Sequence, residues 1–145
     1  MTFVTRHNDS LNRLFEPFFG RFAFDEMPVT GSWAPPVDVA EDAERIHVKV
    51  EVPGMDEKDL KVNYQDGLLT ISGERQFEKK EDRNYHRIER AYGSFQRTFT
   101  LPRTVDGSAI SATYNNGVLE IEIPKREEAK PRQIQINVGS KQIHS

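Results

Sequence analysis

The chain contains no cysteine. It therefore forms no disulfide, builds no thiolate zinc site and has no cysteine nucleophile, and this composition fits a reducing compartment. It also lacks a run of about 20 apolar residues that could cross a membrane. Its first residues do not resemble a signal peptide, because Arg6, Asp9, Arg13 and Glu16 interrupt any apolar segment. We therefore expect a cytoplasmic protein without a membrane partner.

The groups needed for catalysis or metal binding do not occur together. The four histidines are scattered along the sequence, at positions 7, 47, 86 and 144. No serine sits in a nucleophile-elbow motif, and no glycine-rich loop could hold a phosphate. The acidic residues alternate with lysine and arginine, which is typical of a solvated surface rather than a metal site. We expect no enzymatic activity, no catalytic residue, no metal and no cofactor.

A strong basic character is also missing. The net charge of −3 and the pI of about 5.8 disfavour a nucleic-acid partner, which usually requires a basic face. Arg83, Arg87 and Arg90 lie near one another, but acidic residues interrupt them. The 145 residues are 30% charged and 36% hydrophobic, so we expect one domain with a modest core and polar flanking segments.

Residues 111–124 give the clearest structural signal. Asn116-Gly117 can adopt the positive φ angles of a tight hairpin turn. After this turn, Leu119, Ile121 and Ile123 alternate with polar residues, so one face of the strand is apolar and the other is solvated. A lone hairpin is not stable in water. Its apolar face must therefore lie on another sheet.

The same local pattern occurs earlier in the chain, where Asp66-Gly67 joins a strand at 60–64 to one that starts near Leu69. Residues 46–52 and 95–101 also alternate with a period of two, and Pro35-Pro36 marks the point where these runs begin. The sequence therefore predicts an all-β domain with a two-sheet core.

Arg97 falls on the apolar face of the expected strand at 95–101, between Phe95 and Phe99. A guanidinium there costs several kcal/mol to desolvate unless it is paired. Two explanations remain open: the side chain reaches water at the end of the strand, or it forms an ion pair at an interface.

The first 33 residues hold six of the nine phenylalanines and the only tryptophan. Asp9 or Ser10 could cap a short helix that Pro17 limits. These rings either pack onto the domain or line an oligomer interior, or they form a reversible adhesive surface for non-native chains. The candidate client-binding residues are Phe3, Leu11, Leu14, Phe15, Phe18, Phe19, Phe22, Phe24 and Trp33.

Two segments outside the predicted sheets could serve assembly. The charged stretch 74–94 has room for a short strand at 85–90, so it is either a solvated flap or a flap that pairs with the sheet edge of another subunit. Near the C-terminus, Ile134 and Ile136 point the same way on an extended chain. They either insert into a groove at a sheet edge or belong to a last strand of the same subunit.

Several of these motifs resemble those of the small heat shock proteins, the Hsp20/α-crystallin family. The run from Ala112 to Leu119 is similar to the family signature A-x-x-x-x-G-V-L, and Ile134-Gln135-Ile136 is similar to its C-terminal I-x-I motif. Val52-Pro53-Gly54 and the stretches 69–75 and 93–102 also resemble family strand motifs. In one departure, Thr100 stands where many members carry a second basic residue.

The resemblance implies an immunoglobulin-like β-sandwich that acts as an ATP-independent holdase. Such a protein binds partly unfolded clients and prevents their aggregation until ATP-dependent chaperones refold them. The implied domains are a Phe-rich arm at 1–34, an α-crystallin domain at 35–126 and a C-terminal extension at 127–145. By the same resemblance, a homodimer forms by exchange of a strand and assembles into a larger homo-oligomer.

The resemblance also assigns roles to particular residues. The implied dimer interface comprises Tyr85, His86, Arg87, Ile88 and Arg97. Ile134 and Ile136 would dock into a groove on a neighbouring dimer that is lined by Leu60, Val62, Tyr64, Ile110 and Ala112. Two other functions compete with the holdase: a non-enzymatic co-chaperone and a ligand-binding β-sandwich module. A co-chaperone would lack both the Ile134/Ile136 island and the N-terminal phenylalanines.

Overall fold

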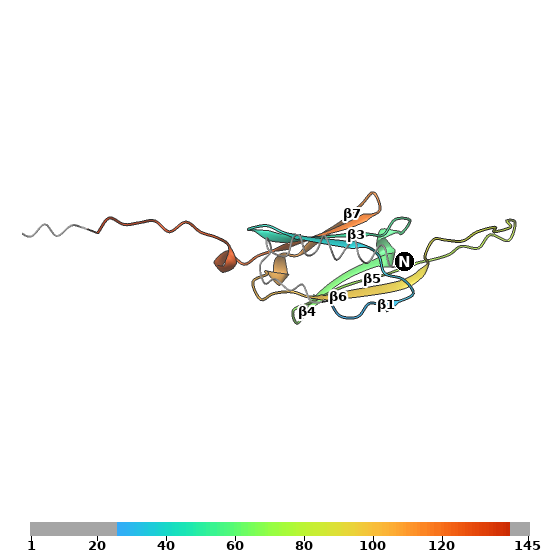
Figure 1. The fold of residues 1–145 in the computed structure, drawn as a ribbon, viewed down its shortest axis with the longest axis horizontal. Coiled ribbons are helices and arrows are strands. Elements are labelled where there is room, and N and C mark those ends of the chain that lie inside the picture. The colour runs from blue at the N-terminus through green and yellow to red at the C-terminus, as the bar shows by residue number, and fades with distance from the viewer. Residues whose placement is uncertain (1–25, 140–145) are drawn as a thin grey trace, which may run out of the picture.

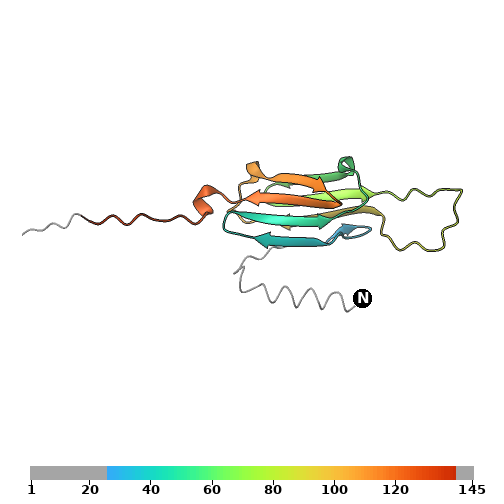
Figure 2. The ribbon, with the colours of Figure 1, turned by 90° about the horizontal axis from the view of Figure 1, so that it is seen from above.

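Two antiparallel four-stranded sheets lie face to face in the computed structural model, which describes residues 26–139 (Figure 1). One sheet has the strand order β1-β6-β5-β4, and the other has the order β2-β3-β8-β7 (Figure 2). The expected all-β sandwich is therefore confirmed. The strands are β1 (Thr30–Gly31), β2 (Val37–Glu41), β3 (Arg45–Glu51), β4 (Leu60–Gln65), β5 (Leu68–Arg75), β6 (Gly93–Thr100), β7 (Ser111–Asn115) and β8 (Val118–Pro124).

The core lies between the sheets and consists of alternate residues of each strand. In β3, Ile46, Val48 and Val50 are buried, whereas the residues between them face outward, as the period of two predicts. In β8 the buried residues are likewise alternate ones, namely Leu119, Ile121 and Ile123. The buried apolar residues are Ile46, Val48, Val50, Val52, Met55, Leu69, Ile71, Phe95, Phe99, Leu101, Val105, Leu119, Ile121 and Ile123.

The two predicted hairpin turns are present. Asp66 and Gly67 have φ values of 51° and 77°, and Asn116 and Gly117 have φ values of 53° and 78°. Positive φ at both central residues is the geometry that suits the right-handed twist of paired strands. These turns set the register of β4 with β5 and of β7 with β8.

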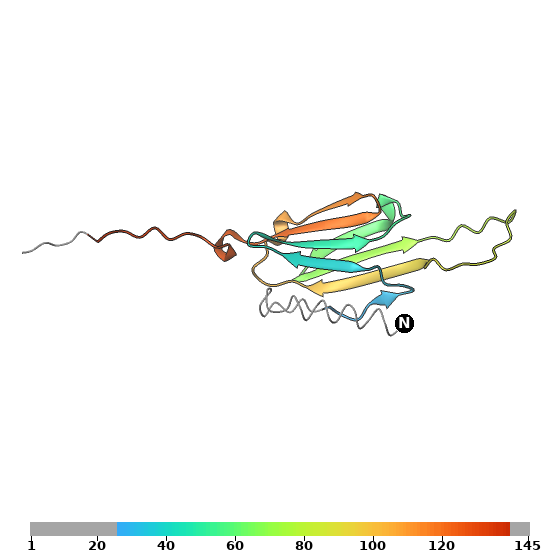
Figure 3. The ribbon, with the colours of Figure 1, turned by 45° about the horizontal axis from the view of Figure 1, so that its top comes forward.

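The ordered sheet begins ahead of the expected domain boundary at residue 35. β1 pairs with β6, and Met27 donates a backbone hydrogen bond to Thr98. Pro35 is fully buried. Residues 26–34 therefore cover an edge of the sheet instead of belonging wholly to a separate arm (Figure 3).

Two segments project from opposite ends of the sandwich (Figures 1 and 2). At one end, residues 76–92 form a long loop between β5 and β6, which we call the flap. At the other end the tail, residues 131–139, follows the last of three short 3₁₀ helices, which are Glu57–Asp59, Gly107–Ala109 and Glu127–Ala129. Neither the flap nor the tail contains a strand.

Candidate functional site

One candidate surface consists of β4 and β7, which are edge strands of the two sheets and carry residues predicted for a docking groove. Leu60 and Val62 of β4 lie in the inward-facing row, beside Gly73 and Ile71 of β5. Ala112 of β7 lies opposite the buried Ile121, yet it is exposed. Inward-facing side chains should be covered. Their incomplete burial shows that the two sheets do not close over each other along this side.

Two tyrosines and an isoleucine complete this candidate surface. The ring of Tyr64 lies so close to Gly107 that a Cβ atom at that position would overlap it, and the ring remains 38% exposed. Tyr114 donates a hydrogen bond from its hydroxyl to the carbonyl of Val52 at 2.8 Å. Ile110 is partly buried against the core. The five residues predicted for a docking groove thus lie on β4 (Leu60, Val62 and Tyr64), on β7 (Ala112) and directly before β7 (Ile110).

The two isoleucines predicted to dock are not covered by their own chain. Ile134 is 76% exposed and Ile136 is 90% exposed. The tail carries no strand, so the alternative of a last strand in the same subunit does not occur in this structure. Exposed isoleucines on an extended segment are available for another molecule.

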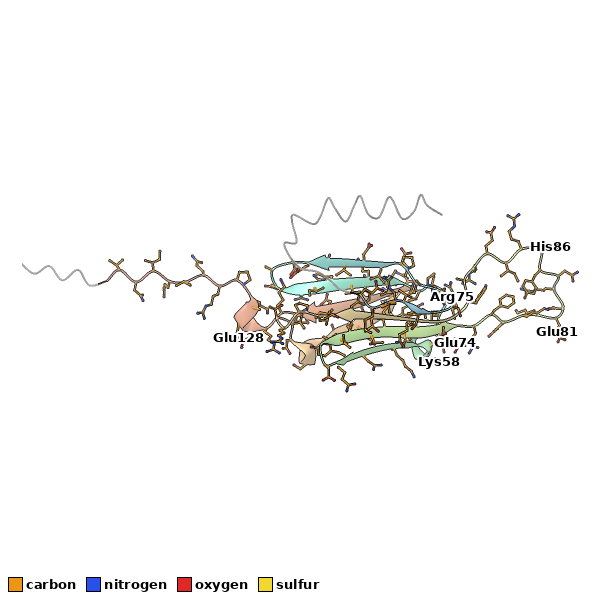
Figure 4. All side chains as sticks on the ribbon, turned by 60° about the horizontal axis from the view of Figure 1, so that its bottom comes forward. Lys58, Glu74, Arg75, Glu81, His86 and Glu128 are labelled. Carbon is orange, nitrogen blue, oxygen red and sulfur yellow. The ribbon has the colours of Figure 1, made fainter. Side chains whose placement is uncertain are left out.

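The base of the flap is held by Arg75, the last residue of β5. Its side chain is buried; Nε donates to the carbonyl of Ala91 at 2.8 Å and Nη1 donates to the carbonyl of Pro53 at 3.0 Å. The guanidinium also lies 4.2 Å from the ring centre of Trp33. Burial, and then the nearby charge of Arg90, lowers the pKa of Arg75 from its ordinary value. Arg75 therefore joins both stems of the flap to the sandwich (Figure 4).

Beyond this anchor the flap makes mainly local contacts. Phe77 contacts Tyr85 and Tyr92, with ring centres 5.3 and 4.9 Å apart, and the amide of Lys80 donates to the Tyr85 hydroxyl. Ile88 is 54% exposed. The predicted strand at 85–90 does not form in the single chain. Four of the five predicted dimer residues, from Tyr85 to Ile88, thus lie together on an exposed loop.

The fifth of these residues, Arg97, lies on β6 and is bound within its own chain. Its guanidinium makes two hydrogen bonds of 2.6 Å to the carboxylate of Glu26, and Nη1 donates to the carbonyl of Pro35 at 2.7 Å. The side chain is only 16% exposed. The cost of desolvating the guanidinium is therefore offset by a carboxylate of the same chain, which differs from both explanations that the sequence left open.

Of the predicted client-binding residues, only Trp33 lies within the described part of the chain. Its indole donates to the carbonyl of Gly93 at 2.9 Å, and its ring meets Phe95 edge-on at 5.1 Å. Trp33 therefore packs onto the domain, which is one of the interpretations given for the N-terminal aromatic residues. The other eight lie outside the described residues: Phe3, Leu11, Leu14, Phe15, Phe18, Phe19, Phe22 and Phe24.

The titratable groups of residues 26–139 serve local structure. Asp42, in the turn between β2 and β3, accepts hydrogen bonds from His47 and from the amides of Glu44 and Arg45. The His47 hydrogen bond, followed by the two amides, holds the pKa of Asp42 well below its ordinary value. Within this range, no group of three acidic, histidine or cysteine residues could hold a metal ion, and no helix is long and apolar enough to span a bilayer.

The fold agrees with the comparison to known families. The sequence profile of the Hsp20/alpha crystallin family matches residues 38–137, which is more than half of the chain. The chain belongs to this family. The family comprises the small heat shock proteins, which are stress chaperones and are generally not enzymes.

Individual relatives support the assignment over most of the chain. Small heat shock protein C2 of Rickettsia felis is 37% identical over 131 residues, which cover 87% of this chain and 84% of the relative. Heat shock protein 16 of Schizosaccharomyces pombe is 36% identical over 126 residues, which cover 85% of this chain and 88% of the relative.

Solved structures agree as well. A small heat-shock protein from Xylella fastidiosa, described as having a distinct high order structure, has a TM-score of 0.64 and 41% identity, covering 73% of this chain and 98% of that chain. Heat shock protein 16.0 of Schizosaccharomyces pombe has a TM-score of 0.63 and 38% identity, covering 72% of this chain and 99% of that chain. These neighbours thus share the sandwich fold of this small heat shock protein.

The sequence did not predict two residues that hold these segments in place: Arg75 at the base of the flap and Glu26, which binds Arg97. Arg75 could have been found, because Leu69, Ile71 and Gly73 place it next in the inward-facing row. Glu26 gave no such signal, since it lies 71 residues before Arg97 in a segment without periodicity.

Proposed function

We propose that this chain is an ATP-independent holdase of the cytoplasm, which binds partly unfolded proteins and prevents their aggregation. The observation that carries the proposal is that apolar residues of β4 and β7 are incompletely buried while two isoleucines of the tail are left exposed by their own chain. Neither feature is useful to an isolated monomer. Together they indicate a molecule built to assemble with copies of itself.

The proposed oligomer forms in two steps, of which dimerisation is the first. β2 is an edge strand with a single neighbour, β3, and an unpaired strand edge readily accepts another strand. The flap is exposed, has no strand of its own and carries Tyr85, His86, Arg87 and Ile88. In the proposed homodimer, the flap of each protomer adds a strand beside β2 of its partner. Arg97 supports this edge by fixing Pro35, two residues before β2 begins.

Docking of the tail is the second step. Ile134 and Ile136 of one dimer enter the groove between β4 and β7 of a neighbouring dimer. Docking removes the aliphatic surface of both isoleucines from water. It also covers the groove residues, which are Leu60, Val62, Tyr64, Ile110 and Ala112. Because the tail leaves the sandwich at the end opposite the flap, both contacts can form at once (Figure 3).

Client binding by such a protein requires no active site. Any surface that binds unfolded chains and not native ones lowers the concentration of aggregation-prone species by mass action. The N-terminal apolar residues from Phe3 to Phe24 are the proposed client-binding surface. No nucleotide enters the cycle at this stage, and release of the client falls to ATP-dependent refolding chaperones.

The handover to these chaperones provides a test. A heat-labile enzyme is denatured by heating with this protein, cooled, and then given ATP with or without an ATP-dependent refolding system. Enzymatic activity is expected to return only when both ATP and the refolding system are present, because a holdase stores its client without folding it. Activity that returns with this protein alone would contradict the proposed role. Heating the enzyme with an equal mass of an inert protein serves as the control.

A further inference from the structure

The outer face of the sheet β2-β3-β8-β7 carries a row of charges that alternate in sign across neighbouring strands. Glu120 of β8 lies opposite Lys49 of β3, and Lys49 lies opposite Asp38 of β2. The Lys49 ammonium is 3.5 Å from the Glu120 carboxylate. Opposite charges on directly facing strand residues are stabilising. The charges along the row are therefore negative at Glu120, positive at Lys49 and negative at Asp38, and the row ends there at the edge of the sheet.

Asp38 ends this row, because β2 is the last strand of its sheet among the described residues. It is exposed, and within residues 26–139 no ion pair includes it. Backbone hydrogen bonds join Asp42 to Arg45 and Glu51 to Pro36, so by the alternation of an antiparallel pair Asp38 bonds toward β3. The amide and carbonyl groups of Val37 and Val39 then point to the open edge. A strand added there would continue the row with one side chain opposite Asp38.

The flap sequence determines which side chains can take that place. Ile88 is the only aliphatic residue from 79 to 90, and it belongs in the inward-facing row that Val37 and Val39 begin. Because strand side chains alternate, Arg87 and Glu89 then face outward, whichever direction the strand runs. If Arg87 lies opposite Asp38, a positive charge continues the alternation of charges. If Glu89 lay there, two carboxylates would be side by side.

We propose that Arg87 of one protomer pairs with Asp38 of its partner, and that this pair fixes the register of the exchanged strand and selects a second copy of this chain as the partner. The inference rests on the proposed strand exchange. In the single chain Arg87 lies 3.4 Å from Glu89, but these side chains are 80% and 74% exposed. Such a solvated pair is weak and leaves Arg87 free to change partners.

The test reverses one charge at a time in the full chain and then mixes the variants. In Asp38→Lys every dimer contact sets lysine against Arg87, and in Arg87→Glu every contact sets glutamate against Asp38. A mixed dimer instead holds one original pair and one reversed pair, and both are attractive. Each variant alone is expected to raise the dimer dissociation constant about tenfold or more, since each dimer contains two such contacts. The mixture is expected to return to within about threefold of the parent.

Sedimentation over a range of concentrations measures the dissociation constants, and circular dichroism confirms that each variant folds. Asp56→Lys is the matched control, because it makes the same change of charge on an exposed turn away from β2. Single variants that dimerise like the parent, or a mixture that stays as weak as its components, would overturn the inference.

A further variant separates this inference from the proposed strand exchange. Ile88→Pro removes a strand hydrogen bond and an inward-facing side chain, so it is expected to abolish exchange. If Ile88→Pro dissociates the dimer while the charge reversals do not, strand exchange holds and the Asp38–Arg87 pairing is wrong. If Ile88→Pro leaves the dimer intact, strand exchange itself is wrong.

Discussion

Replacing Ile134 and Ile136 together by alanine is expected to reduce the oligomer to dimers or smaller species. These side chains are 76% and 90% exposed in the single chain, so docking has almost their whole surface to remove from water. Burying one isoleucine contributes roughly 1.5–3 kcal/mol, and alanine keeps only a small part of that. Each dimer carries two tails, and the loss multiplies because the contacts of one assembly are linked.

Size-exclusion chromatography with light scattering measures this change in mass. Gln135→Ala is the matched control, because it shortens a side chain of the same segment that points away from the two isoleucines. The control is expected to elute with the parent. An Ile134→Ala/Ile136→Ala variant of unchanged mass would show that the tail does not join the dimers.

Replacing Phe15, Phe18 and Phe19 by serine is expected to raise several-fold the amount of protein needed to keep a client soluble, while the sandwich still folds. The described surface offers little for an unfolded chain to bind, because its outer sheet faces are polar. Ser72, Gln96 and their neighbours cover one sheet, and charged residues cover the other. Most of the exposed large apolar residues belong to the surfaces that the proposed assembly uses: Tyr64 on β4, Phe77, Tyr85 and Ile88 in the flap, and Ile134, Ile136 and Val138 in the tail, with Met27 and Val29 besides.

The ratio of protein to client at half-maximal protection measures this effect. Phe77→Ser is the control, because it removes one partly exposed ring from the flap and leaves the N-terminal segment intact. Thermal unfolding followed by circular dichroism checks that the sandwich is unchanged. Full protection by the triple serine variant would place the client-binding surface elsewhere in the molecule.

The strands of the sandwich could be predicted from the sequence because their signals are local. Asn116-Gly117 and Asp66-Gly67 fix their turns through their own backbone preferences, and the period of two identifies the buried face of β3 and β8. β1 could not be predicted, since two residues without a periodic pattern gain their place only by pairing with β6, more than 60 residues later. The expected boundary at residue 35 differs from the structure for this reason.

The functional surfaces, too, could be predicted from the sequence only in part. The residues of the predicted groove come from the family resemblance, whereas their incomplete burial depends on how far the two sheets overlap, which no local pattern encodes. The energy of desolvation predicted that Arg97 either reaches water or forms an ion pair at an interface. Its partner, Glu26, comes from a segment that the sequence assigned to the arm. The strand expected at 85–90 is not formed in the single chain, and in the proposed dimer it would form only beside the partner.

Light scattering of a heat-labile client, heated with and without this protein in the absence of nucleotide, tests the holdase activity most directly. Suppression of scattering at a near-stoichiometric ratio, unchanged when ATP is added, is the predicted result. Undiminished scattering in the presence of the folded, assembled protein would contradict the proposed function and would mean that this chain keeps the family scaffold without the chaperone activity.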